Sequence, residues 1–75
     1  IDKFKIEDKM EYLRKNIETG VRIPFSSIAV KCSSKIEVVV TFLALLELMK
    51  LRYVTVIQER NFREIYVERV EEHEE

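Results

Sequence analysis

The chain has 75 residues, of which 47% are hydrophobic and 36% are charged, and its net charge is −1. This composition is that of a folded globular domain and argues against intrinsic disorder. Four carboxylates fall in the last five residues, so residues 1–70 hold 13 basic and 10 acidic side chains, a net charge of +3. Such a balance falls well short of the dense Lys/Arg surface of a dedicated DNA-binding domain.

The length predicts one small domain, near the lower limit that a single core stabilises. The single cysteine, Cys32, cannot form an internal disulfide, which fits a reducing, cytoplasmic compartment. Because the sequence begins with Ile1 and charged residues, we expect no signal peptide and a fragment cut from a longer protein. Its longest apolar run is too short to span a bilayer.

The first predicted element is a helix from about Asp8 to Thr19. Asp8 and Glu11 have the spacing of a capping box, which marks a helix start. Gly20 follows where a left-handed C-terminal cap is expected. Helical spacing predicts a core-facing stripe formed by Met10, Leu13 and Ile17.

In residues 21–25 the apolar Val21, Ile23 and Phe25 alternate with Arg22 and Pro24, which predicts a short strand. It should lie at the edge of a sheet, because proline is tolerated only there. A brief helix is predicted next. It is capped by Ser26 or Ser27 and extends to about Cys32.

The segment from Val38 to Leu51 is apolar around most of a helix circumference. Its only polar interruptions are Thr41, Glu47 and Lys50. Ser34 and Glu37 form an S-x-x-E capping box directly before it, so we predict a helix from Lys35 to about Leu51. A surface helix of a small domain needs an apolar stripe only about 100° wide, so this one has apolar surface in excess.

The remainder is rich in β-forming residues. Residues 53–57 and 65–67 flank a polar turn with Asn61 near its tip, which predicts a hairpin. The predicted order is helix, strand, helix, helix, strand, strand. This α+β order is typical of a winged helix-turn-helix domain, here residues 1–70, with the long helix in the recognition position and the hairpin as the wing. Residues 71–75 are predicted to be an acidic, solvated tail.

No set of residues suited to catalysis is recognisable. The only histidine, His73, lies in the acidic tail, and one Cys with one His is too few for a zinc site. A phosphate-binding loop needs several glycines, and the chain has one. We interpret Cys32 as a small buried hydrophobic residue. We therefore expect no enzymatic activity, no cofactor and no metal.

A rotation of about 100° per residue divides the long helix into two faces. The predicted core line runs through Val38, Phe42, Leu45 and Met49, with Leu46 and Leu48 on its flanks. The predicted opposite face holds Val40, Leu43, Ala44, Glu47 and Leu51. In a winged helix the opposite face normally enters the DNA major groove.

Bases are recognised there by hydrogen-bonding side chains, which valine, leucine and alanine do not offer. Glu47 would also repel phosphate. A protein partner is therefore the better account of this face. The alternative that a neighbouring segment covers it within the domain stays open.

The predicted wing is polar apart from Phe62, close to its turn. Phosphate contact through Arg52, Arg60 and Arg63 is physically possible. Phe62 either folds back onto the core or faces outward as an anchor for a protein partner, and both alternatives stay open.

Two stretches together resemble a known family. Glu37 to Leu51, EVVVTFLALLELMKL, and Val54 to Ile65, VTVIQERNFREI, are similar to the C-terminal winged-helix domain of prokaryotic kleisins, the segregation and condensation protein A family. The TFLALLEL string and the QExxFxEI wing occur in the right order and spacing. Arg52 stands where the family often has Gly, so we expect the turn after the long helix to differ in shape. Asn61, in the wing, stands where Pro is common.

The resemblance implies a non-enzymatic subunit of a chromosome-organising SMC complex in the cytoplasm, associated with the nucleoid. In such complexes the kleisin's N-terminal part binds the neck of one SMC protein, and its C-terminal winged helix binds the ATPase head of the other. The chain thereby closes a ring. The resemblance implies no membrane or metal and only indirect or weak contact with DNA.

Site residues are carried over by position. Those that match the family's helix motif are Phe42, Leu43 and Leu46. Those that match its wing motif are Gln58, Glu59, Phe62, Glu64 and Ile65. The predicted SMC-head-binding residues are these wing residues together with Val40, Leu43, Ala44 and Glu47 of the helix.

Two other functions stay open. A DNA-binding winged helix of a transcription regulator would bind duplex DNA with a steep dependence on salt. Self-association would join two copies of the apolar face about a two-fold axis.

Overall fold

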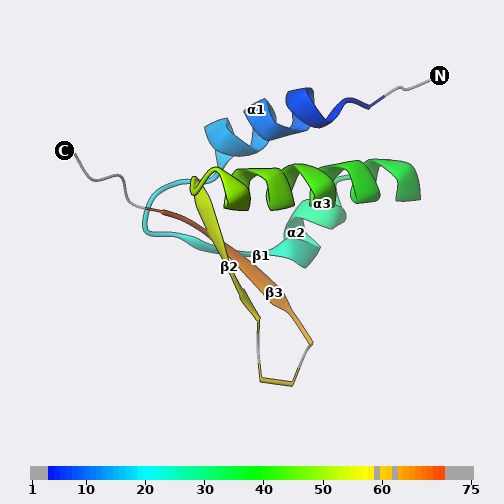
Figure 1. Cartoon of the computed structure of the whole chain (residues 1–75). Coiled ribbons are helices and arrows are strands. Elements are labelled where there is room, and N and C mark those ends of the chain that lie inside the picture. Colours follow the sequence, from blue (N-terminus) through cyan, green and yellow to red (C-terminus); the bar gives the residue numbers. More distant parts are fainter. Residues whose placement is uncertain (1–3, 59, 62, 71–75) are drawn as a thin grey trace.

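The computed structural model describes residues 4–58, 60–61 and 63–70 (Figure 1). Its elements are α1 (Ile6–Asn16), β1 (Arg22–Pro24), α2 (Phe25–Ala29), α3 (Lys35–Lys50), β2 (Val54–Gln58) and β3 (Ile65–Arg69). The order is the predicted one, and it confirms an α+β, winged helix-like small domain. Figure 1 shows α1 beside α3, while the β2–β3 hairpin projects away from both helices.

The three strands form one antiparallel sheet in the order β1-β3-β2. The central strand β3 pairs through Val67 with Ile23 on one side and with Val56 on the other. Pro24 ends the edge strand β1, where a residue without an N–H is tolerated. The wing is formed by β2 and β3, and β2 lies at the opposite edge of the sheet from the short strand β1.

A single core joins α1, α3 and the sheet. Its buried residues are Leu13, Ile17, Ala44, Leu45, Leu48, Val54 and Val67. The stripe predicted on the first helix is confirmed, since Leu13 and Ile17 are buried and Met10 packs against the core.

The limits of α1 differ from the predicted ones. The helix begins after Lys5, whose side chain makes no capping bond, so the predicted cap at Asp8 is wrong. Asp8 lies in the first turn instead, where its charge favours the positive end of the helix. The helix ends because Ile17 takes an extended conformation and enters the core. Gly20 has a left-handed φ of 82°, but in the turn before β1 and not at the helix end.

The N-terminus of α3 has the predicted cap. The Ser34 hydroxyl accepts a hydrogen bond from the Glu37 N–H at 3.1 Å. The Glu37 carboxylate does not return to Ser34; it accepts from the N–H and the hydroxyl of the preceding residue, Ser33, at 2.7 and 2.9 Å. The helix therefore starts where the S-x-x-E pattern predicts.

The C-terminus of α3 closes with a Schellman motif. The Tyr53 N–H donates to the Leu48 carbonyl at 2.9 Å, and the Arg52 N–H donates to the Met49 carbonyl at 3.0 Å. Arg52 has a φ of 68°. This is the left-handed conformation that glycine adopts without steric cost, so an arginine here makes the turn that suits glycine.

Replacing Arg52 with Gly is expected to stabilise the domain. A residue with a Cβ pays about 1–2 kcal/mol in the left-handed region, and the greater freedom of an unfolded glycine offsets part of that gain. We expect a net rise of roughly 0.5–1 kcal/mol in the free energy of unfolding, measured by urea denaturation. As a control, Lys50→Gly within the helix should lower it by about 1 kcal/mol. A loss of stability in both variants would contradict the argument.

Candidate protein-binding surface

The solvent side of α3 is apolar. Its exposed side chains are Ile36 (65%), Val39 (54%), Leu43 (42%), Leu46 (38%) and Met49 (39%). We call these five residues the outer face of α3. The helix α1 and the strand β2 both contact α3, and Figure 1 shows α1 beside it. The exposed fractions show that neither covers the outer face. A contiguous exposed apolar surface of this kind marks an interaction site.

The buried side of α3 differs from the predicted core line. Its fully buried residues are Thr41, Ala44, Leu45 and Leu48. The prediction is confirmed for Leu45, and Val38 is half-buried. It is wrong for Phe42, Leu46 and Met49, which are 36–39% exposed.

The reason for this error is Thr41. Thr41 is polar and so is not expected in a core, yet its hydroxyl donates a hydrogen bond to the Glu37 carbonyl at 2.7 Å within the helix. A hydrogen-bonded hydroxyl can be buried at little cost. The buried side of α3 therefore centres on Thr41 and Leu48. Around the helix axis it is rotated by a little less than a right angle from the predicted core line. Two small residues at positions i and i+3, Thr41 and Ala44, are the signal that α1 packs there.

The helix residues predicted to bind a partner differ in how far the structure exposes them. Leu43 is exposed on the outer face, as that role requires. Val40 and Glu47 are half-buried. Ala44 is fully buried in the core, so its assignment to a binding face is wrong. Leu51 follows the helix and is 53% exposed.

Phe42 links the outer face of α3 to α2. Its ring packs edge-to-face against Phe25, with 5.6 Å between the ring centroids. This contact fixes the ring of a residue that is still 36% exposed. Phe42 therefore extends the apolar surface of α3 toward α2.

The wing residues are described in part. Gln58 ends β2 with an exposed side chain, and Ile65 begins β3 half-buried. Glu59 and Phe62 lie outside the described residues, so both interpretations of Phe62 stay predictions.

Glu64 connects the wing to α2. Its carboxylate accepts hydrogen bonds from the N–H of Ser26 at 3.2 Å, the hydroxyl of Ser26 at 2.9 Å and the N–H of Ile65 at 3.2 Å. The bonds from Ser26 are the main cause of a lowered pKa of Glu64. In the free domain Glu64 thus joins the loop end of the wing to α2, a role that sequence reasoning missed.

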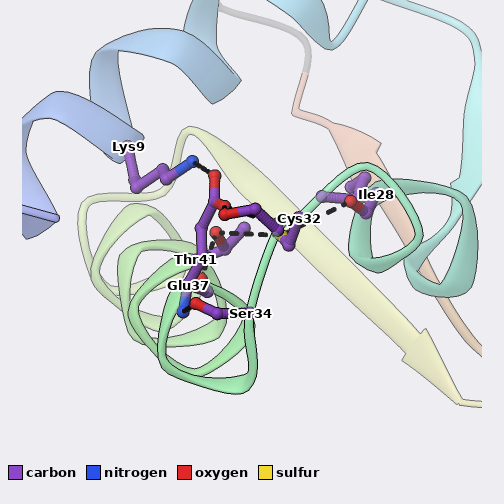
Figure 2. Close-up of polar contacts among 7 residues, drawn as sticks. Lys9, Ile28, Cys32, Ser34, Glu37 and Thr41 are labelled. Atoms are coloured by element: carbon purple, nitrogen blue, oxygen red, sulfur yellow. Dashed lines mark hydrogen bonds and ion pairs between the residues drawn. The ribbon is translucent and has the colours of Figure 1, made fainter.

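Glu37 holds α1 against the start of α3 (Figure 2). Its carboxylate pairs with the Lys9 ammonium, and the two side chains are only 13% and 19% exposed. The hydrogen bond from Lys9, followed by those from Ser33, lowers the pKa of Glu37 from 4.5 to about 2. Figure 2 shows the contacts continuing through Thr41 and Cys32 to the Ile28 carbonyl in α2.

This lowered pKa predicts how stability depends on pH. The contribution of ionised Glu37 is complete above the unfolded-state pKa of about 4.5 and is lost as the pH falls toward the folded-state value of about 2. The urea midpoint of the unmodified chain should exceed that of Glu37→Gln at pH 7, and the difference should shrink between pH 4.5 and 2. A difference independent of pH would contradict the ionised pair as its source. Glu11→Gln, in an exposed pair with Lys15, is the control.

The described residues offer no other evident chemistry. Among residues 4–58, 60–61 and 63–70, no group of three or more His, Cys, Asp or Glu side chains is arranged to hold a metal ion. The Cys32 sulfur is half-buried, 3.7 Å from both the Ile28 carbonyl and the Thr41 hydroxyl. In the same part of the chain, no helix has the length and apolar character needed to cross a bilayer.

Comparison with known proteins agrees with the resemblance. Residues 4–70 match the model of the family described as Segregation and condensation protein ScpA. Relatives named Segregation and condensation protein A include those of Clostridium tetani (54% identical over 74 residues, 99% of this chain and 29% of the relative) and Clostridium acetobutylicum (58% over 69 residues, 92% and 28%). That of Brevibacillus brevis is 36% identical over 66 residues, 88% of this chain and 26% of the relative.

This chain therefore spans less than a third of the length of these relatives. The match nevertheless extends over nearly all of the described domain, from α1 to the end of β3. The chain belongs to the segregation and condensation protein A family.

Proposed function

We propose that this chain is the C-terminal winged-helix domain of a kleisin, a protein-binding module without enzymatic activity. It docks on the ATPase head of an SMC protein and so helps to close the ring of a chromosome segregation and condensation complex. The names of its relatives support a role in segregation and condensation. In this proposal ATP hydrolysis belongs to the SMC head.

The outer face of α3 is the observation that carries the proposal. Its five apolar side chains occupy the recognition position of a winged helix and are 38–65% exposed. Burying them against a partner removes apolar surface from water, which is the main driving force of protein association. These side chains offer no hydrogen bonds to base edges, so the surface suits protein and not duplex DNA.

Calorimetric titration of this chain with a purified SMC ATPase head tests the proposal. Leu43→Lys and Leu46→Lys should each weaken binding by about 30-fold or more, because a charge would be buried in the centre of the interface. Both side chains are partly exposed in the free domain, so both variants should keep its circular dichroism spectrum. Val21→Lys, at a 43% exposed position before β1, is the control and should bind as the unmodified chain does.

Three outcomes would count against the proposal. If the unmodified chain binds no SMC head, the function is wrong. If both leucine variants bind undiminished, the surface is wrong. If the unmodified chain shifts duplex DNA at low salt and the shift fades steeply as salt rises, the regulator alternative gains support.

A further inference from the structure

A lysine stands at each end of the outer face. Lys35 and Lys50 are the first and last residues of α3. Together with Val39, Leu43 and Leu46 they repeat at intervals of four, four, three and four residues, which places all five side chains on one line along the helix. At about 1.5 Å per residue, the two lysines lie roughly 22 Å apart along the axis. The solvent side of α3 is thus an apolar ridge that ends in a cation at both ends.

Neither lysine is explained by the stability of the domain. Among the described residues Lys35 takes part in no ion pair. It also lies at the positive end of the helix dipole, where a cation is unfavourable. Lys50 pairs with Glu47 at 3.5 Å, and the two side chains are 74% and 45% exposed, an arrangement that contributes little to stability.

Cations outnumber carboxylates in α3 and the residues that flank it. Residues 30–52 contain four cations, Lys31, Lys35, Lys50 and Arg52, and two carboxylates, Glu37 and Glu47. Glu37 is held by Lys9 on the side of α3 that faces α1. Only Glu47, half-buried at the edge of the ridge, remains to oppose the four cations.

We propose that the partner surface docked on α3 is apolar in its centre and carries a carboxylate near each end, about 22 Å apart along the helix axis. This rests on the proposed function and specifies which surface of the SMC head would fit. Each lysine then gains an opposite charge at the rim of the interface, while the apolar side chains between them are buried. Charges placed this way fix the direction in which the helix lies on its partner.

The same charges oppose a second copy of this chain as the occupant. In an antiparallel two-fold pairing of outer faces, Lys35 of each copy would meet Lys50 of the other. In a parallel pairing each lysine would meet its own counterpart. Both arrangements bring cations together, and like charges face to face are unfavourable.

The test is the salt dependence of binding to the isolated SMC head. The affinity of the unmodified chain should fall as NaCl rises from about 50 to 500 mM. The double variant Lys35→Glu with Lys50→Glu should bind at least about tenfold more weakly at the lower salt, and its affinity should rise as NaCl rises, because salt screens the new repulsion between carboxylates. The control is Lys5→Glu, directly before α1, with Lys15→Glu in α1. It makes the same change in net charge at exposed positions and should bind as the unmodified chain does.

The possible results separate this inference from the proposed function. If Leu46→Lys abolishes binding while the Lys35/Lys50 variant binds normally, the SMC-head proposal stands and the paired carboxylates are wrong. If the unmodified chain sediments as a dimer through α3, or binds duplex DNA through the two lysines, the inferred occupant is also wrong. Loss of binding in the Lys35/Lys50 variant alone, with the Lys5/Lys15 control unaffected, supports it.

Discussion

Replacing Leu45 with Ala is expected to lower the free energy of unfolding by about 3 kcal/mol, whereas Leu46→Ala should lower it by less than about 1 kcal/mol. The two leucines are neighbours in the same helix, and their intrinsic helix propensities are identical. Leu45 is fully buried against the core, and Leu46 is 38% exposed on the outer face. Only the first change leaves a cavity.

The effect is large for a domain of this size. Chains of 75 residues have a free energy of unfolding of roughly 4–11 kcal/mol, so the Leu45 variant should lose a major part of its stability. Urea denaturation at pH 7 measures both variants, and the slope of the transition should stay unchanged.

The two substitutions should affect binding affinity in the opposite order to stability. Once folded, the Leu45 variant should retain affinity for a partner on the outer face, and the Leu46 variant should lose it. Equal stability losses at the two positions would show that α3 is buried on both sides, and the proposed docking surface would then be wrong.

The order of elements was predictable because it depends on local signals. Ser34 and Glu37 mark the start of α3, and their hydrogen bond forms as the S-x-x-E pattern predicts. Leu13 and Ile17 mark the buried stripe of α1 by their spacing. Pro24 identifies an edge strand because it lacks an N–H.

The faces of α3 were harder to predict because the helix is apolar on nearly every side. Periodicity identifies a buried face only when the exposed face is polar. The core side was decided instead by packing against α1, where Thr41 and Ala44 are small enough for a close approach. Both small residues are visible in the sequence, but the polar hydroxyl of Thr41 argues against a place in the core.

The ties between elements were not predictable from local pattern. Glu37 with Lys9 and Glu64 with Ser26 join residues 28 and 38 positions apart. The family resemblance predicts Glu64 in the binding surface, yet in the free domain its carboxylate joins the wing to α2. A residue within a family motif can therefore shape a surface without itself contacting a partner.

Arg69→Met is expected to lower the free energy of unfolding by about 1–3 kcal/mol. The guanidinium of Arg69, in β3, donates to the carbonyls of Arg14 and Ile17 at 2.6 and 3.0 Å. These carbonyls lie at the C-terminal end of α1, where backbone acceptors lack partners within the helix and the dipole favours a cation. Methionine keeps much of the apolar stem and removes the donors.

The control for Arg69 is Arg22→Met in β1. Arg22 is also an arginine of the sheet, but its side chain is 54% exposed and its ion pair with Glu68 is 3.6 Å long. Its loss should cost less than about 0.5 kcal/mol. Since Arg69 fastens the end of α1 to the central strand, its variant should also speed amide hydrogen exchange in the last turn of α1, while Arg22→Met should not. Equal effects of the two changes would show that the contact between Arg69 and α1 contributes nothing beyond an ordinary surface charge.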